Sequence, residues 1–139
     1  MACCRNVEIV HADALEYDYS SLAGTWKVVA NLPYYISTPI IQRLLRFRDK
    51  FTSLTLMLQK EVAERVTAGP GTKSYAPLGI LLQNEFEAKI AFTVAPGSFL
   101  PPPKVQSAVL TMRRRPVPLL HGAADEPFRV FLRAAFAER

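Results

Sequence analysis

Residues 28–39 constrain the fold of this chain more than any other part of its sequence. The stretch opens with three small apolar residues, which predict a short buried strand, and this strand ends on the run Asn-Leu-Pro-Tyr at positions 31–34. Ser37 or Thr38 and then Pro39 predict the N-cap and first turn of a helix. Ligands in open α/β sheets bind outside the carboxyl ends of strands. We therefore expect a binding site here, where an amide, backbone carbonyls and a flat ring suit a planar base with an exocyclic amine.

Strand-like and helix-like segments alternate along most of the chain. The patterns predict strands at residues 7–10, 27–30, 53–58, 87–94 and 105–112, and helices at residues 38–51, 59–66 and 78–86. Glycine and proline predict loops at residues 68–76 and 95–104. This alternation is typical of the α/β class with a mainly parallel sheet.

The carboxyl-terminal part of the sequence has a different character. Three arginines at 113–115 precede Pro116 and Pro118, and this change of composition indicates a boundary. We expect residues 1–115 to form one domain, residues 116–126 a linker, and residues 127–139 an amphipathic helix. Its apolar face lacks an obvious partner, so the helix is predicted to be the first element of a further domain.

Composition excludes several classes of protein. The chain carries 17 basic and 12 acidic residues in 139, a net charge of +5 that is compatible with binding to nucleic acid. Its only cysteines are Cys3 and Cys4, which provide no disulfide framework and fit a reducing cytosol. Zinc-ligand spacing, a signal peptide and a membrane-spanning run are absent from the sequence. We therefore expect a cytoplasmic protein without a metal site or a membrane anchor.

Four blocks of sequence in a fixed order identify a family. They are residues 31–39, 59–65, 70–75 and 99–109, which read NLPYYISTP, QKEVAER, PGTKSY and FLPPPKVQSAV. Together they resemble the KsgA-type ribosomal RNA adenine dimethyltransferases, and Asp13-Ala14 is similar to an Asp-Ala element that follows a strand in that family. A lone Asn-Pro-Tyr-like motif would be weak, but four ordered blocks from about Asn6 to Arg139 are specific.

The resemblance implies a fold and an activity. The expected fold is a Rossmann-like class I S-adenosylmethionine-dependent methyltransferase, with an incomplete, mainly parallel sheet and the start of a C-terminal helical domain. The expected activity is the transfer of methyl groups from S-adenosylmethionine to N6 of two adjacent adenines near the 3′ end of small-subunit ribosomal RNA. The expected partner is the immature small ribosomal subunit, and the full-length enzyme is expected to be a monomer.

The site residues follow from matching the motifs. Asn31, Leu32, Pro33, Tyr34 and Phe99 are expected to bind the target base and carry the catalysis. Adenine N6 is a poor nucleophile, and the Asn31 side-chain oxygen with the Leu32 or Pro33 carbonyl can accept hydrogen bonds from its N–H groups in the transition state. Tyr34 can stack on the base and Phe99 can close its other face. Taken singly, each of these residues is as readily explained by a turn or by packing.

Further residues are assigned to the cofactor and to RNA. Asp13, Ala14 and Asn31 are expected to contact the cofactor, although Asp13 alone would more often be a turn or capping residue. The basic residues expected to bind RNA are Lys73, Lys104, Arg113, Arg114 and Arg115. Each of the basic residues alone is as well explained by a solvated surface.

One feature departs from the family pattern. A methyltransferase of this type should begin with a strand and a glycine-rich turn that lets the backbone approach the cofactor, but no glycine precedes Gly24. We therefore interpret the chain as a fragment that is inactive by itself. Two alternatives stay open: a large-subunit ribosomal RNA adenine methyltransferase of the macrolide-resistance type, and a non-catalytic RNA-binding or ribosome-assembly factor on the same scaffold.

Overall fold

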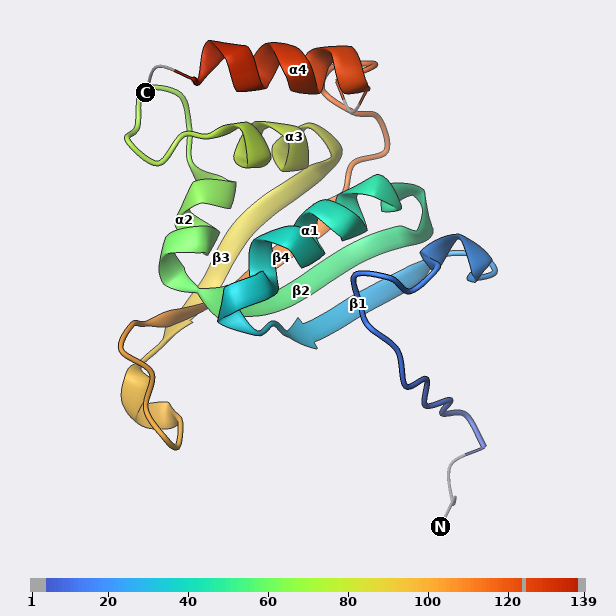
Figure 1. Cartoon of the computed structure of the whole chain (residues 1–139), viewed down its shortest axis with the longest axis vertical. Helices are drawn as coiled ribbons and strands as arrows, with labels where there is room; N and C mark the ends of the chain where they lie inside the picture. The colour runs from blue at the N-terminus through green and yellow to red at the C-terminus, as the bar shows by residue number, and fades with distance from the viewer. Residues whose placement is uncertain (1–4, 124, 138–139) are drawn as a thin grey trace.

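A four-stranded sheet in the order β1-β2-β4-β3 forms the centre of the molecule in the computed structural model, which describes residues 5–123 and 125–137 (Figure 1). The strands are β1 (Trp26–Asn31), β2 (Phe51–Gln59), β3 (Phe86–Val94) and β4 (Ser107–Arg114). The helices are α1 (Ser37–Arg46), α2 (Lys60–Thr67), α3 (Pro77–Glu85) and α4 (Glu126–Ala135). Four short 3₁₀ turns connect them: η1 (Tyr19–Ser21), η2 (Tyr34–Ile36), η3 (Arg48–Lys50) and η4 (Pro96–Ser98).

The strand directions refine the predicted sheet. The α/β class is confirmed, and β1 and β2 pair in parallel as expected. However, β4 pairs antiparallel with both β2 and β3, so only one of the three adjacent pairs is parallel, although β1, β2 and β3 share one direction. The reason lies in the connection between β3 and β4. No helix long enough to carry the chain back occurs there, so the strand that follows the proline loop returns in the opposite direction.

The core lies between the sheet and helices α1, α2 and α3. Along β2 the side chains alternate, with Leu54, Leu56 and Leu58 fully buried and the residues between them half-buried. Helix α1 buries an apolar stripe against this face. Helix α3 comes so close to the end of α2 that a Cβ atom on Gly79 would lie 2.4 Å from the Arg65 carbonyl oxygen. Only glycine fits there.

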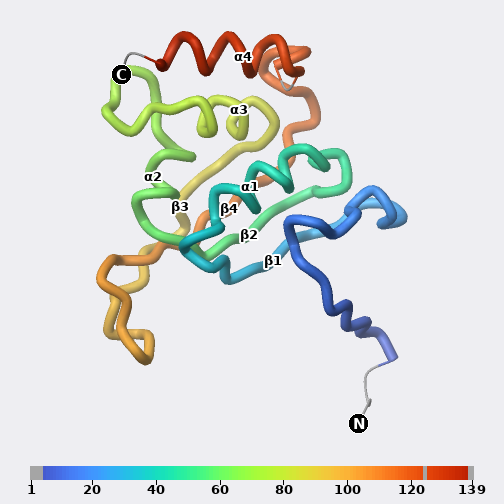
Figure 2. The backbone as a smooth tube through the Cα atoms, viewed as in Figure 1, coloured from blue at the N-terminus to red at the C-terminus, as the bar shows by residue number. Residues whose placement is uncertain are grey.

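Most predicted elements are confirmed to within two residues, but the strand predicted at residues 7–10 is wrong. That segment is irregular and leads away from the sheet, and Ile9 is 91% exposed (Figure 2). No described strand lies beside it to pair with its backbone groups. Its β-branched composition therefore has nothing to pack against, and propensity alone does not make a strand.

The predicted helix at residues 38–51 begins and ends earlier than expected. Ser37 is not its N-cap, because the Ser37 hydroxyl donates to the Tyr34 carbonyl at 3.2 Å and the cap position is Ile36. The helix ends at Arg46, and after η3 the chain starts β2 at Phe51. Phe51 is buried in the core as the first residue of β2, so the helix cannot extend to it.

Helix α4 lies over α3 at the top of the molecule (Figure 1). Leu132 is the buried contact on its apolar face, whereas Val130 and Phe131 are more than half exposed. Residues 116–123, expected to be a linker, run along the end of α3 and make hydrogen bonds to it. No helix among the described residues is long and apolar enough to span a membrane.

Candidate active site

A pocket of about 400 Å³ lies where β1 ends and the proline loop returns towards the sheet. The lining residues are Asn31, Leu32, Pro33, Tyr34, Phe99, Leu100, Pro101 and Pro103. The structure therefore brings together all five residues that the sequence motifs assigned to the target base, although Phe99 is 65 or more positions from the other four. Leu100, Pro101 and Pro103 were not predicted, and their place in the block that contains Phe99 is the signal for them.

Leu32 fixes the backbone of the turn. Its N–H donates to the Met57 carbonyl on β2 at 2.9 Å, and its side chain is buried in the core. Pro33 follows with φ −58° and ψ 131°, and the chain then enters η2. Because one residue is anchored and the next is rigid, the polar groups of the turn are held in fixed directions.

Two hydrogen-bond acceptors remain available at this turn. Asn31 is exposed, and no described residue makes a hydrogen bond to its side chain. The Pro33 carbonyl accepts from the Ile36 N–H at 3.2 Å, whereas no described donor reaches the Leu32 carbonyl. Of the two carbonyls considered from the sequence, the Leu32 carbonyl is therefore the one left free. An amide oxygen and a backbone carbonyl together suit an amino group with two N–H donors.

Tyr34 is fixed by a hydrogen bond to a buried residue. Its hydroxyl shares a hydrogen bond with the Ser107 hydroxyl at the start of β4. Ser107 is fully buried and was not among the predicted site residues, although it lies in the block that contains Phe99. The ring of Tyr34 is thereby fixed at the pocket while remaining partly exposed. A ring held in this way can stack on a planar ligand with little loss of side-chain entropy.

The proline loop forms the other side of the pocket. It contains η4, and the Phe99 N–H donates to the Pro96 carbonyl at 3.2 Å. The Leu100–Pro101 peptide bond is cis, and Leu100 is 98% exposed. Prolines restrict the backbone of this loop, which holds Phe99 near the turn at Asn31.

Asp13 and Ala14 are not part of this pocket. Asp13 is exposed and forms a local turn, in which its Oδ1 accepts from the Leu15 N–H at 2.8 Å. Its carbonyl accepts from the N–H groups of Glu16 and Tyr17, and the Ala14 carbonyl accepts from the Tyr19 hydroxyl at 3.0 Å. The cofactor residues expected from the motifs are thus split between Asn31 at the pocket and Asp13 in a separate turn.

The predicted RNA-binding residues fall into two groups. Lys73, Lys104 and Arg113 are exposed and make no ion pair to any described residue. Arg114 instead contacts Asp49 at 2.8 Å and Glu85 at 3.6 Å. Arg115 donates through Nε to the Gln83 carbonyl at 2.9 Å. Only the first group has its charge free for a ligand.

The pocket and the arginine run lie far apart. Ser107 begins β4 beside Tyr34, and at a rise of about 3.4 Å per residue the strand carries Arg113 about 20 Å away. Lys104, by contrast, follows Pro103 directly at the pocket. Lys73 lies on the loop between α2 and α3, which borders a second cavity with Tyr75 and Phe136.

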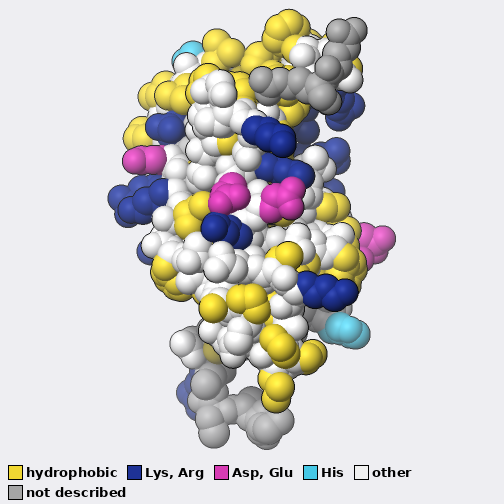
Figure 3. Space-filling model, turned by 90° about the vertical axis from the view of Figure 1, so that its left-hand side faces the viewer, with side chains coloured by type: hydrophobic (Ala, Val, Ile, Leu, Met, Phe, Trp, Pro, Cys, Tyr) yellow, Lys and Arg dark blue, Asp and Glu magenta, His cyan; other side chains and the backbone are white. Residues whose placement is uncertain are grey.

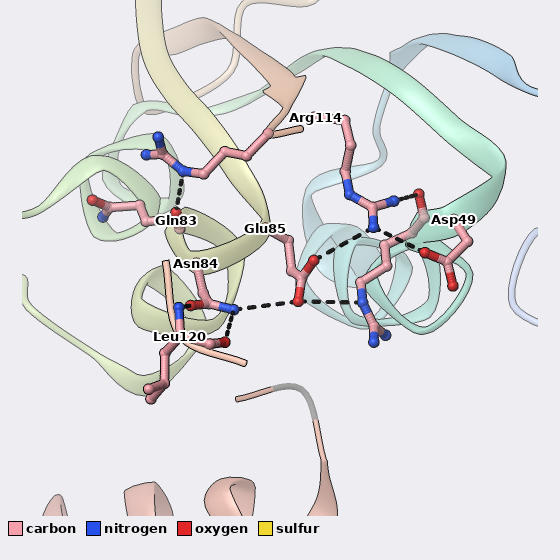
Figure 4. A network of polar contacts seen from close by, with 8 residues as sticks. Asp49, Gln83, Asn84, Glu85, Arg114 and Leu120 are labelled. Atoms are coloured by element: carbon pink, nitrogen blue, oxygen red, sulfur yellow. Dashed lines mark hydrogen bonds and ion pairs between the residues drawn. The ribbon is translucent and has the colours of Figure 1, made fainter. Parts of the chain in front are cut away.

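Arginine and carboxylate groups gather at the far ends of β4 and α3 (Figure 4). Glu85 is 5% exposed, and its carboxylate lies 3.3 Å from Arg48 and 3.6 Å from Arg114. The hydrogen bond from Arg114 lowers the pKa of Asp49 below its usual value of 3.8. This cluster connects η3, the end of α3 and the end of β4, and it was not anticipated from the sequence.

The molecular surface on the side that carries the proline loop is mixed in character (Figure 3). Hydrophobic side chains gather at its top and in its lower part, and most Lys and Arg side chains lie between them. Acidic side chains lie among the basic ones and at the edges of this face. On α2, Lys60 forms an ion pair with Glu64, and Arg65 forms one with Glu61. Among the described residues, no three His, Cys, Asp or Glu side chains are placed to hold a metal ion.

A family model for ribosomal RNA adenine dimethylases matches residues 3–139. The chain belongs to this family. The resemblance read from the four sequence blocks is thus confirmed, and residues of two of those blocks, 31–39 and 99–109, line the pocket.

Curated relatives from several bacteria carry one name, "Ribosomal RNA small subunit methyltransferase A". The relative from Nitrosospira multiformis is 44% identical over 135 residues, covering 97% of this chain and 52% of that protein. The relative from Geobacter metallireducens is 46% identical over 138 residues, covering 96% and 50%. The chain therefore spans about half the length of the curated relatives it matches.

Two solved structures share the fold. A dimethyladenosine transferase from Plasmodium falciparum superposes with a TM-score of 0.80 at 29% identity, covering 96% of this chain and 46% of the other. The 23S rRNA methyltransferase ErmE superposes with a TM-score of 0.77 at 30% identity, covering 95% and 52%. Both are methyltransferases, which confirms the Rossmann-like methyltransferase fold predicted from the sequence. The fold is common to both kinds of enzyme and does not separate them.

Proposed function

We propose that this chain is the target-base half of a small-subunit ribosomal RNA adenine N6,N6-dimethyltransferase that acts in the cytoplasm on immature small subunits. The observation that carries the proposal is the pocket that combines the Asn31 amide, the free Leu32 carbonyl and the rings of Tyr34 and Phe99. The names of the relatives support the small subunit as the substrate. Residues 1–115 would belong to the methyltransferase domain, and the helix from residue 127 would begin a C-terminal domain.

The proposed chemistry follows from the groups at the turn. The Asn31 Oδ1 atom and the Leu32 carbonyl oxygen accept hydrogen bonds from the two N–H groups of adenine N6. These contacts pull the nitrogen towards tetrahedral geometry and stabilise the positive charge that develops on it. The Tyr34 and Phe99 rings hold the base between them, which offsets part of the cost of taking it out of its stack.

The cofactor of the family is S-adenosylmethionine, which supplies an electrophilic methyl group when bound. The residues of this chain fit the cofactor in part. Asn31 lies at the pocket, and one oxygen of the exposed Asp13 carboxylate makes no hydrogen bond to a described residue, so it can accept from a hydroxyl or amine. No glycine occurs before Gly24, so residues 1–23 supply no glycine-rich turn. We therefore propose Asp13, Ala14 and Asn31 as a partial cofactor surface.

RNA beyond the target base would lie against basic residues outside the pocket. Lys104 is the nearest of them in sequence, and Lys73 and Arg113 also carry free charges. Arg114 and Arg115 would influence RNA only indirectly, because both are engaged within the protein. Phosphate contacts of this kind position a nucleic acid without reading its sequence.

A matched pair of variants tests the proposal. The protein made from the complete reading frame is assayed for methyl transfer to immature small subunits, with dimethyladenine in the 3′ hairpin measured by mass spectrometry. Tyr34→Ala should reduce the rate by about 10- to 100-fold, because stacking on an aromatic ring contributes about 1–3 kcal/mol per base. Tyr35→Ala is the control, since Tyr35 is 86% exposed and does not line the pocket.

The same assay separates the alternatives. Equal loss of activity in both variants would contradict a stacking role for Tyr34. Methylation of large-subunit RNA in place of small-subunit RNA would favour the macrolide-resistance type. Binding of small subunits with no transfer by the unaltered protein would favour an assembly factor.

A further inference from the structure

The end of α3 is covered by the segment that follows β4. The last carbonyls of a helix lack donors within the helix and must find them elsewhere. Here the Gln83 carbonyl accepts from Arg115 Nε, and the Glu85 carbonyl accepts from the Arg115 N–H, both at 2.9 Å. The Asn84 carbonyl accepts from the Leu119 N–H at 3.1 Å. A guanidinium at this position is also favoured by the helix dipole.

The side chain of Asn84 adds a second set of bonds to the same segment. Its Oδ1 accepts from the Leu120 N–H at 2.7 Å, and its Nδ2 donates to the Leu120 carbonyl at 3.1 Å (Figure 4). One amide thus pairs with both backbone groups of one residue, as a neighbouring strand would. Asn84 is 6% exposed, so these groups have little access to water.

The orientation of this amide is set by the adjacent carboxylate. Asn84 Nδ2 lies 3.3 Å from Glu85 Oε1, and Glu85 is held in turn by Arg48 and Arg114. The NH₂ group therefore faces the carboxylate, which leaves the amide oxygen directed at the Leu120 N–H.

Apolar burial contributes little to holding residues 117–120 in place. Val117 is 62%, Leu119 69% and Leu120 53% exposed, so their side chains point largely to solvent. Hydrogen bonds to the end of α3 therefore fix residues 117–120, and the next buried apolar side chain along the segment is that of Ala123, which is 2% exposed. Leaving a buried partner of such bonds unsatisfied costs about 1–3 kcal/mol.

The segment leads directly into α4. That helix lies over α3 with Leu132 buried, and just beyond it the ring of Phe136 lies 5.9 Å from the ring of Tyr75. Tyr75 belongs to the loop at residues 68–76, which also carries the exposed Lys73. A connected set of contacts therefore runs from Asn84 through α4 to that loop.

We propose that Asn84 is a positioning residue that fixes residues 116–123 to the end of α3, and with them α4 and the loop that carries Lys73. It does so without touching the base pocket. The expected consequence for RNA binding rests on the proposed function. The role of Asn84 in holding residues 116–123 and α4 does not rest on it.

Hydrogen exchange on this chain tests the structural part. Asn84→Ala should speed exchange by about tenfold at Leu119 and Leu120, throughout α4 and at residues 72–76, with no change in β2. Gln42→Ala, which removes an exposed amide from α1, is the control and should leave all of these unchanged. Faster exchange confined to Leu120, with α4 unaltered, would overturn the proposal.

A second variant covers the case in which Asn84→Ala disturbs the core. Leu120→Pro removes the N–H that Asn84 accepts from and leaves α3 and the sheet untouched. It should reproduce the faster exchange in α4 and at residues 72–76. Unchanged protection of both would contradict the role of this contact.

Kinetics test the consequence for RNA. In the protein made from the complete reading frame, Asn84→Ala should raise KM for the small subunit by about fivefold and leave kcat within about twofold, because the groups around the base are unaltered. A fall in kcat at constant KM would overturn the proposed role of Asn84 in RNA binding. If the unaltered protein transfers no methyl group, the proposed function fails, and the exchange experiment still decides the role of Asn84.

Discussion

Two asparagines near the ends of two elements show how the same side chain serves different purposes. Asn31 at the end of β1 is exposed, and no described residue bonds its amide. Asn84 near the end of α3 is buried, and its amide is paired with the backbone of Leu120 and lies beside Glu85. Buried polar groups need protein partners, whereas an exposed amide at the rim of a pocket stays available to a ligand. The hydrogen-bond partners of each amide therefore distinguish an asparagine that can bind a ligand from one that holds the structure together.

The largest expected effect concerns the exposed asparagine. Asn31→Ala should lower methyl transfer by about 100- to 1,000-fold, the usual cost of removing one donor or acceptor that stabilises transition-state charge. Stability should change by less than about 0.5 kcal/mol, because the side chain makes no bond to a described residue. The rate of methyl transfer and the free energy of unfolding in urea are measured on the same protein. Joint loss of stability and activity would make Asn31 structural and would remove the contrast with Asn84.

The arginine run provides a second contrast between a free and an engaged group. Arg114→Gln should lower the free energy of unfolding by about 1–2 kcal/mol, because Glu85 and Asp49 both lose a charged partner. Arg113→Gln is the matched control in the next position and should change stability by less than about 0.5 kcal/mol. If Arg113 contacts phosphate, its loss should reduce the salt dependence of RNA binding by about one charge. Equal destabilisation by the two variants would contradict the different roles that the ion pairs indicate.

The smallest expected effect on stability concerns Asp49, the exposed member of the network around Glu85. Because Arg114 lowers the pKa of Asp49, the ionised carboxylate stabilises the fold above its usual pKa of 3.8, and this stabilisation is lost as pH falls through the lowered value. The Asp49 side chain is 82% exposed, so Asp49→Asn should cost less than about 1 kcal/mol at pH 7. Unfolding in urea at a series of pH values from 7 downward should show a difference between the two proteins that shrinks with acid. A constant difference would mean that the charge of Asp49 is not involved.

Local patterns were sufficient for most of the fold. Helices α2 and α3 and the four strands were predicted to within two residues, because each has a clear period or a loop of glycine or proline beside it. The prediction failed at residues 7–10, where composition favours a strand but no described neighbour pairs with it. The antiparallel insertion of β4 between β2 and β3 was also missed, since strand order depends on contacts between distant segments.

The sequence by itself determined which residues could form the pocket. Asn31, Pro33 and Tyr34 occur in one short motif, and the blocks that follow identify the family without reference to any contact. Local chemistry decides these points, because proline rigidity, side-chain type and spacing are properties of the chain alone.

Only the tertiary structure decided which groups are free to act. Tyr34 meets Ser107 across 73 positions, Asn84 meets Leu120 across 36, and Arg114 reaches Asp49 across 65. Such partners are chosen by packing of the sheet and helices, which no local pattern encodes. For that reason the sequence treated Arg113 and Arg114 alike and said nothing of Asn84, whereas the structure leaves Arg113 exposed and places Arg114 and Asn84 in the network around Glu85.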